Sequence, residues 1–214
     1  MHIRLTCITR WSNINTIFME ARKGLLIILS GPSGVGKGTI RKKVMEDKSL
    51  NLAFSISCTT RLPRPLERDG VDYYFVKKDY FEKLIKEDEL LEWAEFVGHY
   101  YGTPRGPVEK MREEGKNVIL EIEVEGAKQV MAKCRGNDVI SIFIMPPSLE
   151  ALVERIHSRK NERRTNIEER LAKATREMGL KYNYQYVVLN DDVDRAAEEV
   201  KNIIRDKLNA TIES

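Results

Sequence analysis

The stretch Gly31-Pro-Ser-Gly-Val-Gly-Lys-Gly-Thr39 follows an apolar run, Leu25-Leu-Ile-Ile-Leu29, and leads directly into a helical pattern. Its G-x-x-x-x-G-K spacing is that of a phosphate-binding loop between a strand and a helix. Glycines at these positions let backbone N–H groups turn around an anion, because only glycine takes a positive φ at little cost. The next helix directs its positive end to the same point, and the Lys37 side chain adds a cation.

We therefore predict a loop that binds nucleotide phosphates, in preference to a glycine-rich turn without a ligand. Its residues are Gly31, Pro32, Ser33, Gly34, Val35, Gly36, Lys37, Gly38 and Thr39. The motif expects Ser or Thr after the lysine as a ligand of Mg²⁺, but Gly38 stands there, with Thr39 next. We expect the metal to be held through water or by carboxylates elsewhere. The G-K-G-T ending resembles that of nucleoside monophosphate kinases, which favours a small phosphoryl-transfer enzyme over a motor or signalling ATPase.

Composition limits the class of protein. The 214 residues form one domain, with or without insertions, and can bury a substantial core. The net charge of +3 is too small to indicate a nucleic-acid partner, and charges of both signs are interspersed along the chain. No apolar run reaches the roughly 18 residues that a membrane-spanning helix needs. We expect neither nucleic acid nor membrane as a partner.

Three widely spaced cysteines, Cys7, Cys58 and Cys134, form neither a metal-ligand cluster nor a disulfide framework. A reducing compartment, the cytoplasm, is the natural setting for them. Residues 1–22 differ from the rest, with no acid before Glu20. A transit peptide would fit this pattern. We favour a disordered tail or an overlong gene start with Met19 as the true initiator, since the domain pattern begins at residue 23.

Alternation of strand and helix patterns after residue 23 predicts an α/β protein with a parallel sheet and helices on both faces. Strands are expected at 25–29, 54–57, 71–76, 90–97, 99–102, 118–124, 139–145 and 184–189. Helices are expected from 37 to about 47, from Asp79 as a cap, at 104–115, 126–135, from Ser148, from Thr165, and at 193–208. Residues 54–102 thus form a strand-rich insertion with one helix.

Charged and hydroxyl side chains gather in segments that follow predicted strands, where ligands of open parallel sheets bind. Glu121 and Glu123 lie two apart near the end of one strand and should share one face. Carboxylates in an apolar strand are costly unless paired, which favours a role for them, in orienting the water around Mg²⁺ or accepting a ribose hydroxyl. Arg61 and Arg64, in a proline-rich loop, suit bidentate contact with phosphate.

Several segments together resemble the guanylate kinase family, in order and over roughly residues 24–208. They are Ser57-Cys-Thr-Thr-Arg61-x-x-Arg64, Asp72-Tyr73-x-Phe75, Leu91-Glu92-Trp-Ala94, Tyr100-Tyr101-Gly102-Thr103 and Asn190-Asp-Asp192. The resemblance implies transfer of the γ-phosphoryl group of MgATP to GMP, giving ADP and GDP. It implies a core at 23–53, 103–154 and 168–210, a GMP-binding region at 54–102 and a short mobile lid at 155–167.

Residue roles follow from the same resemblance. The GMP phosphate would be held by Arg61, Arg64, Tyr73 and Tyr101, and guanine by Ser57, Glu92 and Thr103, with Glu121 and Glu123 also in the GMP site. A carboxylate at Glu92 can accept the two adjacent donors of guanine, which adenine lacks. Lys37, Arg155, Arg159 and Arg170 would stabilise the transferring phosphoryl group. Thr39, Glu121 and Glu123 are the candidates to hold Mg²⁺ through water.

Three alternatives stand beside this interpretation. A kinase for another nucleoside monophosphate would not need Ser57, Glu92 and Thr103. A non-catalytic guanylate-kinase-like module that binds proteins typically lacks an intact phosphate loop. A nucleic-acid-binding ATPase has only the basic stretch 158–164 in its favour. The sequence leaves open whether the protein is a monomer or a homo-oligomer.

Overall fold

A computed structural model of the chain describes residues 22–96, 98–157 and 165–212. Its core is a five-stranded sheet in the order β2-β7-β1-β8-β9, and every neighbouring pair of strands is parallel. The strands are β1 (Leu26–Ser30), β2 (Leu52–Phe54), β7 (Asn117–Glu121), β8 (Val139–Met145) and β9 (Tyr186–Leu189). The predicted parallel sheet is confirmed.

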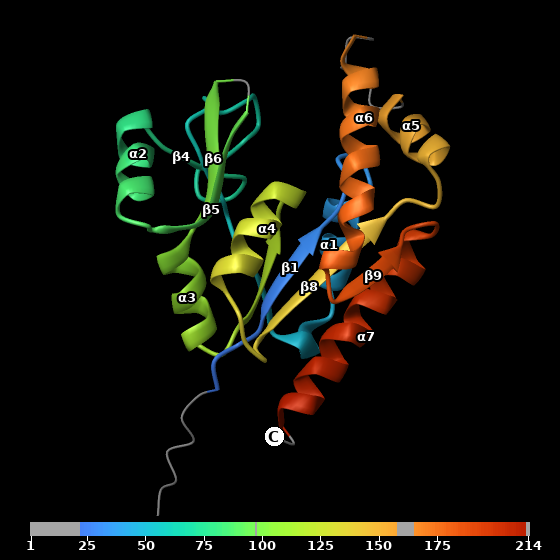
Figure 1. Cartoon of the computed structure of the whole chain (residues 1–214). Helices are drawn as coiled ribbons and strands as arrows, with labels where there is room; N and C mark the ends of the chain where they lie inside the picture. The colour runs from blue at the N-terminus through green and yellow to red at the C-terminus, as the bar shows by residue number, and fades with distance from the viewer. Residues whose placement is uncertain (1–21, 97, 158–164, 213–214) are drawn as a thin grey trace, which may run out of the picture.

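Helices cover both faces of this sheet (Figure 1). Strand β1 is buried throughout, and its side chains alternate between two hydrophobic clusters. Ile27 and Leu29 pack with residues of α1 (Lys37–Val44), α5 (Leu149–His157), α6 (Thr165–Gly179) and α7 (Val193–Ile212). Leu26 and Ile28 pack with residues of α3 (Arg105–Glu113) and α4 (Val124–Lys133). A strand buried on both faces reads as a continuous apolar run, which is the pattern at 25–29.

The ring of Phe143, in β8, is fully buried and lies edge-on to Tyr184, with 4.9 Å between ring centroids. Truncating a buried phenylalanine removes apolar contact and leaves a cavity that the sheet cannot close. We expect Phe143→Ala to lower the free energy of unfolding by about 3–5 kcal/mol, measured by denaturant titration. Phe96→Ala, at an exposed site, is the control, and a loss below about 1 kcal/mol at Phe143 would contradict this packing.

A second sheet, in the order β4-β3-β6-β5, forms the predicted strand-rich insertion. Its strands are β3 (Cys58–Thr59), β4 (Tyr74–Phe75), β5 (Leu90–Phe96) and β6 (His99–Pro104). Helix α2 (Lys78–Lys86) covers it, and Phe81 of that helix is buried between Cys58 and Leu90. The antiparallel pairing of β5 and β6 confirms the predicted hairpin.

Several predicted element bounds were wrong. The strand expected at 71–76 is reduced to Tyr74–Phe75, because residues 61–73 are mostly loop and turn. The strand expected at 54–57 is instead the end of β2, followed by a separate β3. Helix α2 begins at Lys78 after an uncapped Lys77, so Asp79 lies in its first turn and is not the cap. Ser148 does cap α5, since its Oγ accepts a hydrogen bond from the Ala151 N–H at 3.1 Å.

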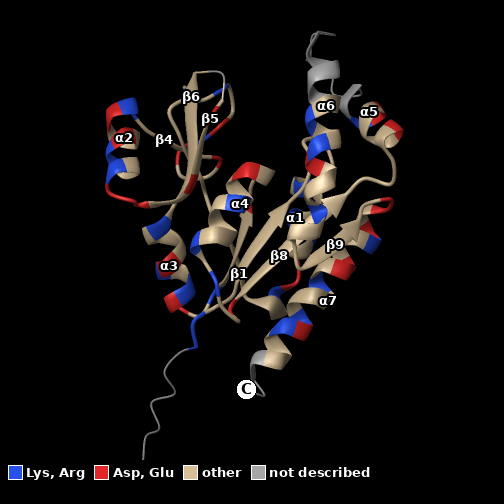
Figure 2. Cartoon of the chain, viewed as in Figure 1, with Lys and Arg blue, Asp and Glu red and all other residues tan. Residues whose placement is uncertain are grey.

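The second sheet with α2, and the pair α5 and α6, lie toward the end of the central sheet to which its strands point (Figure 1). Figure 2 shows Lys and Arg interspersed with Asp and Glu over the helices, while the central strands carry few charges. The predicted basic stretch 158–164 and the N-terminal residues 1–21 lie outside the described residues. Within the described part, no helix has the length and apolar character needed to cross a bilayer.

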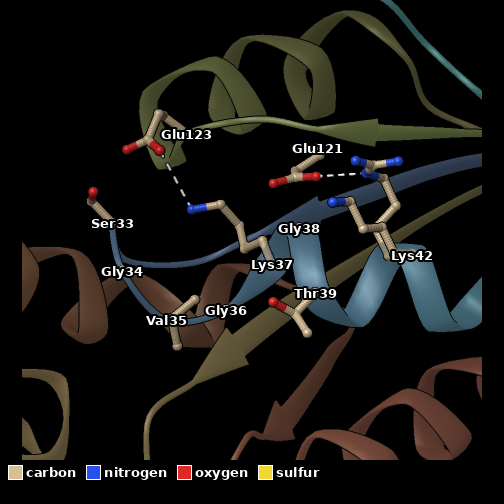
Figure 3. A pocket seen from close by; sticks show the side chains of 11 residues that line it. Ser33, Gly34, Val35, Gly36, Lys37, Gly38, Thr39, Lys42, Glu121 and Glu123 are labelled. Atoms are coloured by element: carbon tan, nitrogen blue, oxygen red, sulfur yellow. Dashed lines mark hydrogen bonds and ion pairs between the residues drawn. The ribbon is translucent and has the colours of Figure 1, made fainter. Parts of the chain in front are cut away.

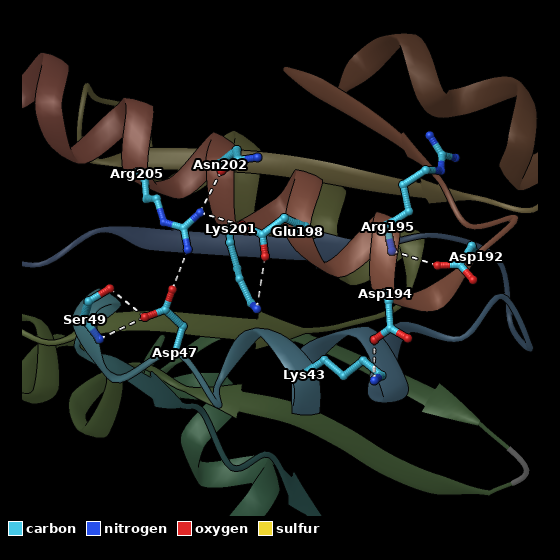
Figure 4. A network of polar contacts seen from close by, with 10 residues as sticks. All are labelled: Lys43, Asp47, Ser49, Asp192, Asp194, Arg195, Glu198, Lys201, Asn202 and Arg205. Atoms are coloured by element: carbon cyan, nitrogen blue, oxygen red, sulfur yellow. Dashed lines mark hydrogen bonds and ion pairs between the residues drawn. The ribbon is translucent and has the colours of Figure 1, made fainter.

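Ion pairs tie helix α7 to α1 and to Asp47, the N-cap residue of the short 3₁₀ helix η1 (Lys48–Leu50) (Figure 4). Arg205 binds Asp47 at 2.6 Å and Glu198 at 2.7 Å, and Lys43 binds Asp194 at 2.5 Å. Hydrogen bonds lower the pKa of the Asp47 carboxyl, and the bond from Ser49 contributes more than the bond from Arg205. These contacts hold α1, and with it the loop that precedes α1, against the C-terminal helix. A second 3₁₀ helix, η2 (Leu180–Asn183), connects α6 with β9.

Candidate active site

Residues 31–36 connect β1 to α1, and the motif 31–39 ends in the first turn of α1, so the predicted order of strand, loop and helix is confirmed. Gly36 lies at φ 101°, a left-handed conformation that side chains other than glycine rarely take. The Lys37 side chain turns back into the loop and is 9% exposed. Its Nζ donates to the carbonyl oxygens of Gly31 at 2.6 Å and Pro32 at 3.3 Å, and pairs with Glu123 Oε1 at 3.4 Å. The loop is therefore preorganised with its cation facing inward.

Two side chains from segments far along the sequence, Arg155 and Asn190, contact this loop. The Val35 carbonyl oxygen accepts hydrogen bonds from Asn190 Nδ2 at 2.7 Å and from Arg155 Nη1 at 3.3 Å. Arg155 Nη2 also donates to the Asn190 carbonyl oxygen at 2.9 Å. A Cβ atom at Gly36 would lie 2.6 Å from Asn190 Nδ2, so glycine at this position permits the close approach. The predicted lid residue Arg155 thus contacts the phosphate loop directly.

The loop forms one wall of a pocket of about 420 Å³, and Glu121 and Glu123 line the same pocket (Figure 3). Glu121 is the last residue of β7 and pairs with Arg41 at 2.7 Å. Glu123 lies beyond the strand, as the residue before α4, and pairs with Lys37 and Lys173. The prediction that both share one strand face was wrong, because the strand ends at Glu121. Both carboxylates are paired, as the sequence argument requires.

The donor set at this pocket fits a magnesium ion that arrives with a nucleotide. Among the described residues, no group of three or more acidic, His or Cys side chains is placed to hold a metal by itself. Mg²⁺ usually keeps several waters and is bound by one or two carboxylates together with substrate phosphates. The Thr39 hydroxyl and the carboxylates of Glu121 and Glu123, all lining the pocket, supply oxygen atoms of that kind.

A second pocket, of about 230 Å³, adjoins the first, since Arg41 and Glu121 line both. Its other lining residues are Phe54, Ser57, Val71, Asp72 and Tyr73. The structure thus brings Ser57 and Tyr73 together with Glu121 in one pocket, as expected of residues that were predicted to bind the same nucleotide. The Tyr73 ring packs edge-on to Tyr101 with 6.1 Å between centroids, and burial raises the pKa of its phenol.

Arg61 lies beside this pocket, with its guanidinium carbon 5.5 Å from the Tyr73 ring centroid. Its two terminal nitrogens bind the two oxygens of Glu67, at 2.9 and 3.0 Å. Glu67 also accepts the Arg64 backbone N–H at 2.7 Å, and these donors lower the pKa of Glu67 to about 2. The Arg64 side chain is exposed, and no described residue pairs with its guanidinium. A carboxylate thus occupies the face of Arg61 predicted to bind phosphate.

Glu92 and Thr103 face each other across the β5–β6 hairpin and are both buried. Thr103 Oγ1 donates to Glu92 Oε1 at 2.6 Å. A Cβ atom at Gly126, in α4, would lie 2.5 Å from Glu92 Oε2, so the carboxylate packs against the start of that helix. Burial raises the pKa of Glu92, and the Thr103 hydrogen bonds oppose the rise. The hydrogen bonds from Thr103 satisfy part of the acceptor capacity of the Glu92 carboxylate. Without a partner, a negative charge buried at this place would be strongly disfavoured.

The remaining two predicted lid residues, Arg159 and Arg170, cannot be placed relative to the site from the described residues. Arg159 lies outside the described residues, and Arg170 belongs to α6 with a side chain that is also outside them. Sequence reasoning gave no functional role to Arg41, Glu67 or Asn190, which contact predicted site residues. Arg41 carried one signal, because it follows Lys37 by one helical turn and so faces the same side of α1.

A parallel sheet with an anion-binding loop after its first strand, and a second pocket beside that loop, define a P-loop nucleotide-binding protein of the phosphoryl-transfer class. The family model described as guanylate kinase matches residues 23–207. The chain belongs to the guanylate kinase family.

Individual relatives agree with this membership. The chain is 50% identical to a guanylate kinase of Onion yellows phytoplasma over 184 residues, covering 86% of each protein. It is 52% identical to a guanylate kinase of Bacillus cereus over 186 residues, covering 87% of this chain and 90% of the relative. The crystal structure of guanylate kinase from Anaplasma phagocytophilum aligns with a TM-score of 0.69 at 36% identity, covering 87% of both chains.

Proposed function

We propose that this chain catalyses the reversible transfer of the γ-phosphoryl group of MgATP to GMP, giving ADP and GDP, within purine nucleotide metabolism. The observation that carries the proposal is that the phosphate-loop pocket and the second pocket share Arg41 and Glu121 as a common wall. A donor phosphate in the first pocket and an acceptor in the second would meet there. Membership of the guanylate kinase family supports this reaction.

In this proposal the protein acts mainly by positioning charge. Backbone N–H groups of the phosphate loop hold the donor phosphates, and Lys37 Nζ exchanges its carbonyl partners for phosphate oxygens. Arg155, already at the loop, and the lid arginines Arg159 and Arg170 stabilise the charge that develops on the transferring group. The magnesium ion would be held through water by Thr39, Glu121 and Glu123, and it neutralises phosphate charge. The lid 155–167 and the region 54–102 close to exclude water.

The acceptor phosphate is proposed to bind Arg61, Arg64, Tyr73 and Tyr101. Arg61 is held by Glu67 in the free protein, which fixes the orientation of the guanidinium before the substrate arrives. Such preorganisation lowers the entropy cost of binding. The acceptor phosphate would bind Arg61 from the side of Arg64 and the two tyrosines while Glu67 stays in place, or it would replace Glu67 as the partner of Arg61.

Guanine is proposed to bind Ser57, Glu92 and Thr103. Its N1–H and 2-amino groups are adjacent donors, and the Glu92 carboxylate is an acceptor-only group when ionised. The Thr103 hydroxyl uses only one of the lone pairs on Oε1, so Glu92 retains acceptor capacity. Adenine would leave this buried carboxylate unmatched, and a site of that kind can discriminate by about 10⁴-fold. This argues against a kinase for AMP or a pyrimidine monophosphate.

The first experiment is ADP production from MgATP with GMP, dGMP, AMP, dTMP, UMP and CMP as separate acceptors. Turnover with GMP, and more weakly with dGMP, is the expected result. Turnover with another acceptor alone would keep the phosphoryl-transfer core and overturn the base assignment. Binding of GMP without any turnover would favour the non-catalytic module.

The pH dependence of GMP binding offers a separate prediction. Burial raises the pKa of Glu92, so the free protein favours the protonated form more than an exposed glutamate does. Guanine needs the ionised form, so GMP affinity should fall as pH is lowered through a value above the usual glutamate pKa of about 4.3. The phosphates of both nucleotides also titrate near about pH 6, so the control is Glu92→Gln, which keeps the phosphate contribution and lacks that of the carboxyl. Titration calorimetry with GMP from about pH 4.5 to about pH 8 would check this, and equal pH profiles for the parent and Glu92→Gln would contradict it.

We also propose a cytoplasmic location, where ATP and GMP are available. Cys58 and Cys134 carry free thiols, which suits a reducing compartment. ATP and GMP are the only partners that the proposal requires, and it holds for a monomer or a homo-oligomer. Nucleic acid and membranes have no part in it.

A further inference from the structure

Arg41 stands in the wall between the two pockets and has no role in the proposed mechanism. It lies on α1, one turn after Lys37, and its side chain is 17% exposed. Its guanidinium carbon is 3.9 Å from the centroid of the Phe54 ring, which fixes its plane from one side. Its Nε donates to Glu121 Oε2 at 2.7 Å. Two planar contacts therefore hold this guanidinium at the junction.

The pair is unlike a surface salt bridge. The Glu121 side chain is 22% exposed, so both charges are largely removed from water. Arg41 Nη1 lies 3.7 Å from Met45 Sδ, and no described residue accepts a hydrogen bond from Nη2. The guanidinium is therefore not saturated by its protein partners, and it adjoins both pockets. An ion pair in such a place influences any charged ligand on either side.

Glu121 presents an electrostatic difficulty that Arg41 resolves. A Cβ atom at Gly38 would lie 3.2 Å from Glu121 Oε1 and 3.6 Å from Oε2. The carboxylate therefore sits directly against the first turn of α1, beside the phosphate-binding loop. An uncompensated negative charge there would repel the phosphates of both nucleotides. Glycine at position 38 leaves the room that this carboxylate occupies.

We propose that Arg41 is a positioning residue for phosphoryl transfer. Through its Nε it holds the Glu121 carboxylate between the two pockets, and its charge offsets that of Glu121 where the two nucleotides approach each other. This inference rests on the proposed function for its consequence on turnover. Its consequence for nucleotide binding can be measured without turnover.

The test is a double-mutant cycle with Arg41→Leu and Glu121→Gln, alone and together. Leucine keeps apolar contact with Phe54 but leaves the Glu121 charge unpaired. We expect Arg41→Leu to weaken binding of GMP and of a non-hydrolysable ATP analogue, each measured alone by calorimetry, by about tenfold or more. In the Glu121→Gln background the same change should weaken binding by less than about threefold, because no charge remains to be offset.

The control for lost positive charge is Lys48→Leu, on exposed η1, which should leave both affinities unchanged. Arg41→Lys retains the charge but lacks the Nε donor and the planar contact with Phe54, so its nucleotide affinities should lie between those of the parent and of Arg41→Leu. It replaces the leucine variant in the cycle if that variant does not fold. Equal losses from Arg41→Leu in the parent and in the Glu121→Gln background would overturn the proposal. A parent protein that binds both nucleotides without phosphorylating GMP would overturn the proposed function, while the cycle in binding still decides the role of Arg41.

Discussion

Lys37→Met is expected to lower kcat for phosphoryl transfer from ATP to GMP by about 10³-fold. Methionine has a similar unbranched side chain and occupies a similar space. It carries no positive charge that could stabilise the transferring phosphoryl group. The Lys37 ammonium is 2.6 Å from the Gly31 carbonyl oxygen, and the residue is only 8% exposed, so its charge acts where water screens little. The rate loss should greatly exceed the loss in GMP affinity, because GMP is proposed to bind in the other pocket.

Steady-state kinetics with both substrates, alongside calorimetric binding of GMP, would measure this separation. Lys110→Met, on an exposed face of α3, is the matched control and should retain the parent rate. Loss of the Lys37 ammonium removes the donor to the Gly31 carbonyl oxygen, whereas the Pro32 carbonyl oxygen keeps the Val35 N–H at 3.2 Å. A thermal melt must therefore show that the variant is folded at the assay temperature. A decrease in kcat smaller than tenfold would show that the loop lysine is not a principal source of stabilisation.

The phosphate loop and the strands of the sheet could be predicted from the sequence because each has a recognisable local sequence pattern. A buried parallel strand needs a continuous apolar run, and a loop that turns around an anion needs glycines at fixed spacing. The order of elements follows from their alternation along the chain. These features can be recognised from local sequence patterns, although the strands of the sheet pair across long stretches of sequence.

Contacts between distant segments were harder to predict. Asn190 reaches Val35 across 155 positions of sequence, and Arg41 reaches Glu121 across 80. Nothing local to either residue specifies its partner. The end of β7 at Glu121 was missed for a related reason, since the apolar pattern continues through Ile122 and Val124 into the start of α4. Periodicity alone does not separate the end of a buried strand from the start of a buried helix.

The residues proposed to bind GMP could be predicted from the sequence only in part. The resemblance to the guanylate kinase family suggested Glu92 and Thr103 together, but the hydrogen bond between them depends on the register of β5 and β6. That register shifts between Leu90 and Glu92, an irregularity that the strand pattern does not reveal. Glu67, which binds Arg61, lies in a proline-rich loop whose charges looked like ordinary surface groups.

Glu92→Gln is expected to lower kcat/KM for GMP by about 10²–10³-fold, because hydrogen bonds to a charged group contribute about 1.5–3 kcal/mol each. The glutamine oxygen can still accept the Thr103 hydroxyl, so the hairpin contact survives. Its NH₂ group, however, faces the guanine 2-amino group as donor against donor. The KM for ATP should change by less than about threefold, since Glu92 is not among the residues that line the phosphate-loop pocket.

A comparison of GMP with IMP separates this role from a structural one. IMP carries hypoxanthine, which retains the N1–H donor and lacks the 2-amino group. The parent should prefer GMP, whereas Glu92→Gln should narrow or reverse the preference, because IMP presents no second donor to the amide NH₂. Glu95→Gln, at an exposed position of the same strand, should keep the parent preference. Equal losses for GMP and IMP would mean that Glu92 supports the hairpin and does not recognise the base.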